Sequence, residues 1–153
     1  MGSTDKAILD RWIEQRDPEA FRAIVESSSA MVHATCTRIL GDAADTQDAS
    51  QECFQKLAET PRPPATYFGP WLHRIATASA LNHIRANKRR KDREARFVAE
   101  RAPQGQAEWN DLYEYVDEAI AGLPAEQRVP LVAHYLQGRT HRVIAEELGV
   151  PRQ

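Results

Sequence analysis

Residues 70–96 read PWLHRIATASALNHIRANKRRKDREAR, and this stretch decides the fold. A proline opens it, and large apolar side chains then recur at steps of three and four, as at Trp71, Leu72 and Ile75. Proline fits the first turn of a helix, and such steps place side chains on one helical face. The stretch therefore predicts a long helix that is apolar along its first half and cationic along its second.

Upstream of this stretch, apolar residues again recur at helical spacing, and no run alternates as a half-buried strand would. Asp17 followed by Pro18 marks the start of a long helix, and Gly41 marks its end. A further helix is expected at about 45–59, before a loop with several prolines that no helix could cross. The N-terminal part is therefore predicted to be a helical bundle.

Downstream, Pro103-Gln104-Gly105-Gln106 indicates a linker, and a new apolar stripe begins after it. Thr140 as an N-cap, Gly149 as a left-handed turn and Pro151 as the first residue of another helix are typical of a helix-turn-helix. Only two residues follow Pro151, so we expect this reading helix to be incomplete. The core of this part is expected to consist of Trp109, Leu112, Val116, Ile120, Val132, Leu136, Ile144 and Leu148.

These observations predict an all-α protein with a helical bundle at 1–100, a flexible linker at 101–108 and an incomplete helix-turn-helix domain at 109–153. The length of 153 residues allows one sizeable or two small domains. No apolar run approaches the roughly 20 residues that a membrane span needs. We therefore expect a soluble, cytoplasmic protein without membrane insertion.

Charge is unevenly distributed along the chain, although the net charge is only −2. Residues 1–70 hold 7 basic and 11 acidic side chains, residues 71–96 hold 8 and 2, and residues 97–153 hold 5 and 9. Segments of opposite sign suggest one surface that faces an anion and another that faces a basic or mixed partner.

The basic segment, residues 85–96, holds seven cations in 12 residues. Lysine and arginine neutralise phosphates and release counterions, so this density favours nucleic acid as the partner over a merely solvated helix end. The segment contains Arg85, Lys88, Arg89, Arg90, Lys91, Arg93 and Arg96, with Asn82, His83 and Asn87 beside it.

Acidic side chains gather on the helix expected at 45–59. Asp45, Asp48 and Glu52 are spaced by three and four residues and so share one face, where like charges repel each other. We interpret this face as a surface for a basic partner, because it lacks the histidine that a metal site would use. No catalytic motif or glycine-rich phosphate loop occurs, so neither an enzyme nor a cofactor is expected.

Four segments, in this order, resemble the extracytoplasmic-function (ECF) group of bacterial RNA polymerase sigma factors. Residues 45–54 (DTQDASQECF) resemble the family signature D-A-E-D-x-x-Q-E-x-F of sigma domain two. Residues 69–76 (GPWLHRIA), with 81–85 (LNHIR), are similar to its W-L-x-R-I-A and promoter-melting helix. Residues 123–128 (LPAEQR) and 138–151 (GRTHRVIAEELGVP) resemble sigma domain four.

The resemblance implies a transcription initiation factor with two partners, core RNA polymerase and promoter DNA. An anti-sigma factor or a regulatory kinase is a further partner that the resemblance leaves open. The residues implied for polymerase binding are Asp45, Asp48, Gln51 and Glu52. The residues implied for DNA binding, through the minus-ten and minus-thirty-five elements, are Arg74, Asn82, Arg85, Lys88, Arg89, Arg90, Lys91, Arg93, Arg139, Thr140, Arg142, Arg152 and Gln153.

The chain departs from the family pattern at several positions. Gln47 stands where glutamate is common, and phosphorylation of the neighbouring Thr46 would restore the charge. Ala78 stands where many relatives have asparagine, and Val143 replaces the acid of a capping box. Because the reading helix is expected to be incomplete, we expect poor recognition of the minus-thirty-five element.

Three alternatives stay open at this point. A truncated sigma factor could occupy polymerase or an anti-sigma factor without initiating, and a helix-turn-helix regulator could act on DNA without polymerase. A catalytic or metal-binding bundle has the least support, since the five histidines are scattered along the chain.

Overall fold

The computed structural model describes the backbone of residues 3–97 and 108–149, and the side chains of 6–95 and 115–149. Within these ranges the chain is helical and has no strand, which confirms the predicted all-α class. The elements are α1 (Ser3–Gln15), α2 (Pro18–Leu40), α3 (Ala43–Glu59), α4 (Phe68–Phe97), α5 (Glu108–Gly122), α6 (Ala125–Leu131), the π-helical turn η1 (Val132–Leu136) and α7 (His141–Leu148).

Local capping fixes the start of α2, α3 and α7 and the end of α2 and α7. The carboxylate of Asp17 accepts a hydrogen bond from the amide of Glu19 at 2.9 Å, as expected for the N-cap of α2. Gly41 ends α2 in the left-handed region, with φ 67°. α3 begins at Ala43, two residues earlier than expected, because Asp42 serves as its cap.

Helix α4 is the long helix that residues 70–96 predict, and it begins two residues before Pro70. Proline is tolerated there because amides of the first turn have no partner within the helix. Pro130, by contrast, lies inside α6, directly before the backbone changes to the π-helical turn.

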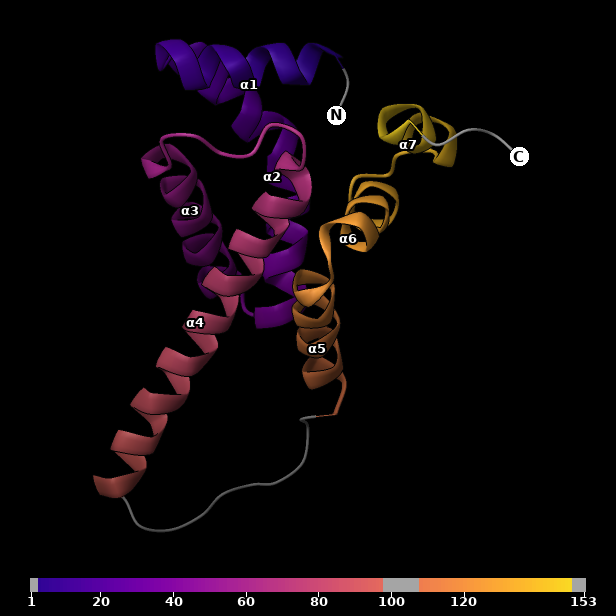
Figure 1. The fold of residues 1–153 in the computed structure, drawn as a ribbon. Coiled ribbons are helices and arrows are strands. Elements are labelled where there is room, and N and C mark those ends of the chain that lie inside the picture. The colour runs from indigo at the N-terminus through magenta and orange to yellow at the C-terminus, as the bar shows by residue number, and fades with distance from the viewer. Residues whose placement is uncertain (1–2, 98–107, 150–153) are drawn as a thin grey trace.

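Helices α1–α4 form a bundle in which α2 contacts α1, α3 and α4 (Figure 1). Its core consists of fully or nearly buried apolar side chains. These include Leu9, Trp12, Ile24, Val32, Cys36, Cys53, Leu57 and Leu72. We refer to α1–α4 as the N-terminal bundle.

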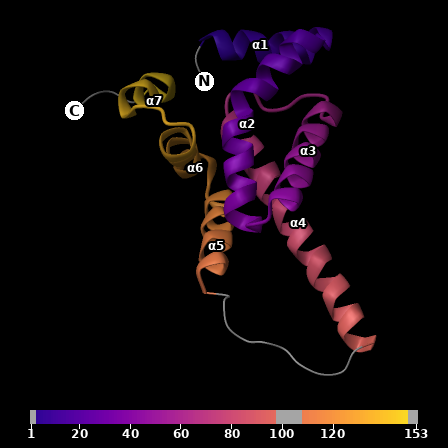
Figure 2. The ribbon, with the colours of Figure 1, turned by 180° about the vertical axis from the view of Figure 1, so that it is seen from behind.

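Helices α5–α7, which we call the C-terminal unit, pack against the N-terminal bundle. α5 runs beside α2 and α4, on the side away from α3 (Figures 1 and 2). Val132 is fully buried in the same apolar cluster as the core of the bundle. Gln137 lies so close to Gly69 that a Cβ atom there would collide with its side chain. The two parts therefore share one continuous core.

Two of the residues expected in the C-terminal core are buried, Val132 and Ile144. The expectation is wrong for Val116 and Leu148, whose side chains are 46% and 40% exposed. The side chains of Trp109 and Leu112 lie outside the described residues, as does the expected linker apart from Glu108. In the described part of the chain, no helix is both long and apolar enough to cross a bilayer.

Candidate functional site

The basic segment forms the free end of α4, which extends beyond the N-terminal bundle (Figure 1). Six of its cations are described, and all six are exposed: Arg85, Lys88, Arg89, Arg90, Lys91 and Arg93. Among the described residues, none of the six forms an ion pair with a carboxylate. Their charge is therefore available to an external anion.

Three of these arginines lie on one face of α4. Arg85, Arg89 and Arg93 follow each other at steps of four, and we call them the arginine stripe. The Nε of Arg89 donates to the carbonyl oxygen of Arg85 at 3.3 Å, and the Nε of Arg93 donates to that of Arg89 at 3.2 Å. The exposed Asn82 continues this face toward the bundle. The stripe is thus a row of cations that slants along one side of the helix.

A row of polar contacts connects the middle of α4 to α3. The amide of Asn87 donates to Asp45 at 2.8 Å, and the ammonium group of Lys56 donates to the hydroxyl of Ser79 at 3.1 Å. The ring of His83 contacts the carboxylate of Glu52 at 3.2 Å. Asn87 lies more than 100° around the helix from each arginine of the stripe, and His83 lies more than 100° from Arg85 and Arg89. Helix α3 therefore fixes the rotation of α4 and leaves the stripe free.

The expected polymerase-binding residues lie together on α3, but they are not equally available. Asp48 and Gln51 are exposed. Glu52 forms an ion pair with Lys56 at 2.6 Å as well as its contact with His83. The hydrogen bond from Lys56 is the main cause that holds the pKa of Glu52 below its ordinary value. The expectation of an unpaired acidic cluster is therefore wrong for Asp45 and Glu52.

Thr46 is only 1% exposed, and its hydroxyl group has no hydrogen-bond partner in the structure. A kinase cannot reach this hydroxyl in the folded protein. The hypothesis of a phosphorylation site at Thr46 is therefore wrong for this conformation, and the regulatory kinase loses the observation that supported it.

Arg74 is exposed on α4 but lies apart from the basic segment, about 16 Å along the helix from Arg85. Its charge acts instead on Arg128 of α6. The pKa of Arg128 is lowered first by burial and then by the positive charge of Arg74. Arg74 thus belongs to the boundary between the N-terminal bundle and the C-terminal unit.

The helix-turn-helix residues have local partners. The hydroxyl of Thr140 accepts a hydrogen bond from the amide of Val143 at 3.5 Å and caps α7 as expected. Arg139 forms an ion pair with Glu147 at 2.6 Å, whereas the side chain of Arg142 is exposed. The two remaining DNA-binding residues of the prediction, Arg152 and Gln153, lie outside the described residues.

The structure does not bring the two expected DNA-binding groups together. The free end of α4 and helix α7 lie at opposite ends of the molecule in both views (Figures 1 and 2). In this conformation they are two separate surfaces.

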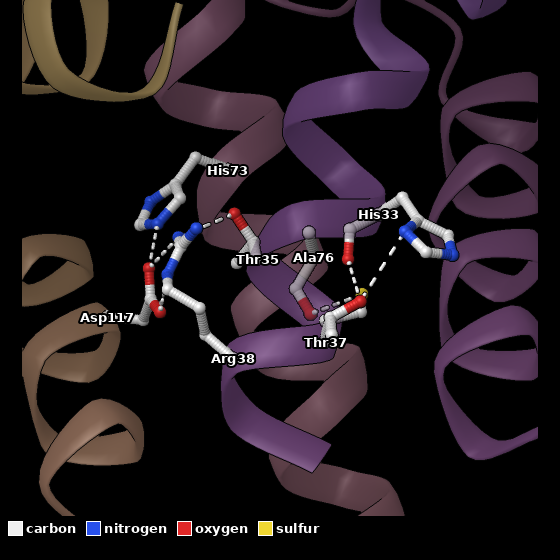
Figure 3. Close-up of polar contacts among 8 residues, drawn as sticks. His33, Thr35, Thr37, Arg38, His73, Ala76 and Asp117 are labelled. Atoms are coloured by element: carbon white, nitrogen blue, oxygen red, sulfur yellow. Dashed lines mark hydrogen bonds and ion pairs between the residues drawn. The ribbon is translucent and has the colours of Figure 1, made fainter. Parts of the chain in front are cut away.

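Sequence reasoning missed a buried polar cluster where the C-terminal unit meets the N-terminal bundle. Asp117 of α5 faces Arg38 of α2 and His73 of α4 (Figure 3). Its carboxylate accepts hydrogen bonds from Arg38 at 2.8 and 3.0 Å, and its Oδ1 lies 2.9 Å from the Nε2 of His73. We call Arg38, His73 and Asp117 the interdomain cluster.

Two of the three residues of the interdomain cluster are shielded from water, whereas the side chain of Arg38 is 29% exposed. Asp117 is 1% exposed and His73 is 0% exposed. Burial alone would raise the pKa of Asp117, but hydrogen bonds from His73 and Arg38, with the charge of Arg38, hold this pKa below its ordinary value. Asp117 is therefore an ionised carboxylate whose stability depends on both partners.

One signal in the sequence points to this cluster. Asp117 lies three residues before Ile120 and four after Tyr113, within the apolar stripe of α5. An acid on an apolar face needs a buried partner. The sequence holds many basic residues, however, and nothing local identifies Arg38 and His73.

Two family models match the chain. Sigma-70 region 2 matches residues 24–90, which contain α3 and most of α4, and Sigma-70 region 4 matches residues 113–153. The interdomain cluster joins the two matched parts, since Arg38 and His73 lie in the first and Asp117 in the second.

Among curated proteins, the chain is similar to the ECF RNA polymerase sigma-E factor of Haemophilus influenzae, at 28% identity over 97% of this chain and 85% of that protein. It is also 24% identical to the ECF RNA polymerase sigma factor SigK of Mycobacterium sp. strain KMS, over 96% of this chain and 81% of that protein. The RNA polymerase sigma-H factor of Pseudomonas aeruginosa is 25% identical, over 96% of this chain and 83% of that protein. The chain therefore belongs to the sigma-70 family of transcription initiation factors, in its ECF group.

Proposed function

We propose that this sigma factor binds core RNA polymerase through the exposed side of α3 and contacts the minus-ten promoter element with the arginine stripe of α4. The observation that carries this proposal is the row of contacts between α3 and α4. It makes the polymerase-binding helix the support of the DNA-binding helix. Docking of α3 therefore sets the position and rotation of the stripe.

The chemistry of the stripe suits an opened strand of DNA. Exposed guanidinium groups that form no ion pair among the described residues can neutralise phosphates, and the exposed amide of Asn82 can donate to a base or phosphate. Separating bases costs a few kcal/mol for each base, which these contacts offset by holding the strand after it has opened. The chain binds the strand and performs no covalent step.

The acidic side chains of the chain explain why its binding to DNA would be assisted by polymerase. The acidic parts that flank residues 71–96 repel DNA, so the isolated chain binds DNA weakly. Docking covers the acidic side of α3 and removes part of this repulsion. The exposed Arg142 supports a second, separate DNA contact in the C-terminal unit.

The test is a pull-down of purified core RNA polymerase with Asp48→Lys. Asp48 is exposed and lies outside the row between α3 and α4, so its reversal leaves the fold intact. Glu26→Lys, the same reversal at an exposed position of α2, is the matched control. We expect the affinity to fall at least about tenfold for Asp48→Lys, about 1.4 kcal/mol, and to stay unchanged for the control.

Equal binding by the two variants would contradict the proposed docking surface. Run-off transcription with the wild-type chain separates the other functions. Binding to polymerase without initiation would favour an interaction module. Sequence-specific binding to duplex DNA without polymerase would favour a helix-turn-helix regulator.

A further inference from the structure

Glu52 lies one turn after Asp48 on α3, beside the proposed polymerase-binding surface, and it is already paired within the chain. We infer that Lys56 and His83 compete with polymerase for Glu52, and that these two residues set how tightly this sigma factor binds polymerase. We call Lys56 and His83 the Glu52 clamp. The inference deepens the proposed function and rests on it, because it requires polymerase to dock on α3.

The Glu52 clamp occupies both oxygens of the carboxylate. The Nζ of Lys56 lies 2.6 Å from Oε1 of Glu52, and the Nε2 of His83 lies 3.2 Å from Oε2. Lys56 belongs to α3 and His83 to α4, so the carboxylate is held between two helices. Asp48, in contrast, is exposed and forms no ion pair among the described residues. A cation of polymerase therefore finds Asp48 free and Glu52 occupied.

The clamp is exposed enough to be displaced. The side chains of Glu52, Lys56 and His83 are 35%, 37% and 25% exposed. An ion pair at this exposure is weak, because water screens it and two long side chains lose freedom in it. A guanidinium group of a partner can donate two parallel hydrogen bonds to one carboxylate, which a single ammonium group cannot match. An arginine of polymerase is therefore the kind of side chain that would take Glu52 from the clamp.

Lys56 has a second partner, which keeps it in place after it releases Glu52. Its ammonium group also donates to the hydroxyl of Ser79 at 3.1 Å, and Ser79 is 0% exposed. When Glu52 turns to polymerase, Lys56 stays bonded to α4 through Ser79, and Asn87 stays bonded to Asp45. Docking therefore costs one of the contacts between α3 and α4 and leaves these two intact.

Competition predicts an effect whose sign structural damage would not produce. Polymerase must break the contacts of Glu52 before it can bind the carboxylate, so removing either member of the clamp should raise the affinity. A loss of structure in α3 would lower the affinity instead. Exposed ion pairs correspond to a change of about two- to fivefold in a binding constant, and we expect a gain of this size for each contact.

The test uses full-length chains that carry Lys56→Met or His83→Phe. Methionine keeps the aliphatic chain and removes the charge, and phenylalanine keeps a ring and removes the donor. The matched control is Arg22→Met, which removes the cation of the local ion pair with Glu19 on α2, at 2.6 Å. The control changes the net charge as Lys56→Met does, and it also frees a glutamate, but away from α3.

The assay is a competition for a limiting amount of purified core RNA polymerase. Wild-type and variant chains are mixed in equal amounts, one of them isotopically labelled, and the ratio of the bound chains is measured by mass spectrometry. We expect about two- to fivefold enrichment of Lys56→Met and of His83→Phe, and none of Arg22→Met. Equal enrichment of the control would overturn the inference, because net charge alone would then explain the gain.

Glu52→Gln decides whether the gain passes through Glu52. In this background the clamp has no carboxylate to hold, so adding Lys56→Met should give no enrichment over Glu52→Gln alone. A gain of the same size in both backgrounds would overturn the inference, since Lys56 would then act on polymerase without Glu52.

A second variant covers the effect of Lys56→Met on folding. The substitution leaves the buried hydroxyl of Ser79 without its partner, which disfavours the folded state. Adding Ser79→Ala removes that hydroxyl, so the double variant tests the competition in a chain without the unsatisfied group. Circular dichroism measures its helical content. Unchanged or weaker binding of polymerase by the folded double variant would overturn the inference.

Failure of this inference and failure of the proposed function give different results. Equal binding of polymerase by Asp48→Lys and Glu26→Lys would contradict the docking surface itself. If Asp48→Lys weakens binding and the clamp variants do not strengthen it, polymerase docks on α3 without competing for Glu52, and only this inference fails.

Discussion

Replacing Arg85, Arg89 and Arg93 together by glutamine should flatten the salt dependence of single-stranded DNA binding. These side chains form one row on α4 and have no carboxylate partners among the described residues. Each can neutralise one phosphate and release its counterion. Glutamine keeps length and hydrogen-bonding capacity and removes only the charge.

The magnitude follows from the number of phosphates. For single strands, the logarithm of the affinity falls with the logarithm of the salt concentration at a slope of about 0.7 for each phosphate neutralised. Three phosphates correspond to a slope of about 2.1. Between 50 and 200 mM salt, the wild-type affinity should therefore fall about 18-fold more than that of the triple variant.

The assay is fluorescence anisotropy with a labelled single-stranded oligonucleotide over this range of salt. The control neutralises three cations on the other faces of the same helix: Lys88, Arg90 and Lys91, each to glutamine. We expect the control to lower the slope by less than about 1, because one strand follows one face. Equal slopes for the two triple variants would refute the reasoning, since they would mean that the whole helix end acts as one diffuse charge.

Three further outcomes follow from the structure. Leu72→Ala should lower the free energy of unfolding by about 2–5 kcal/mol in urea titrations, because Leu72 is fully buried in the bundle. A loss below about 1 kcal/mol would contradict its place in the core. The depressed pKa of Asp117 means that its contribution to the stability of the folded chain is complete above the ordinary value of about 3.9 and is lost as the pH falls further. In urea titrations, the free energy of unfolding should therefore fall more below about pH 4 in the wild type than in Asp117→Asn, and an equal fall in both would contradict this. Cys36 and Cys53 should resist maleimide at pH 8 in the native protein and react in urea, since both thiols are buried and burial raises their pKa. Complete reaction of both thiols in the native protein would contradict this.

The helix boundaries could be predicted because they depend on neighbouring residues. Asp17 caps α2 through the amide two residues later, and Thr140 caps α7 through the amide three residues later. Gly41 and Gly149 both adopt the left-handed conformation expected of them, with φ 67° and 66°. Such contacts are determined within a few residues, so the pattern of the sequence contains them.

Contacts between residues that are far apart in the sequence could not be predicted in the same way. Asp117 and Arg38 are 79 residues apart, and Glu52 and His83 are 31 residues apart. Periodicity predicts which face of a helix is apolar but not what covers that face. Val116 and Leu148 were therefore predicted as core residues, although their side chains are 46% and 40% exposed.

Helix α4 carries the candidate DNA contact and one part of the interdomain cluster on different faces. His73, which meets Asp117, lies more than 100° around the helix from Arg85, Arg89 and Arg93, and it lies about three turns before Arg85. Removing the charge of Asp117 should therefore leave the charge and the orientation of the arginine stripe unchanged. The salt slope of Asp117→Asn on single-stranded DNA should equal that of the wild type. A changed slope would mean that the C-terminal unit itself contacts or covers the strand.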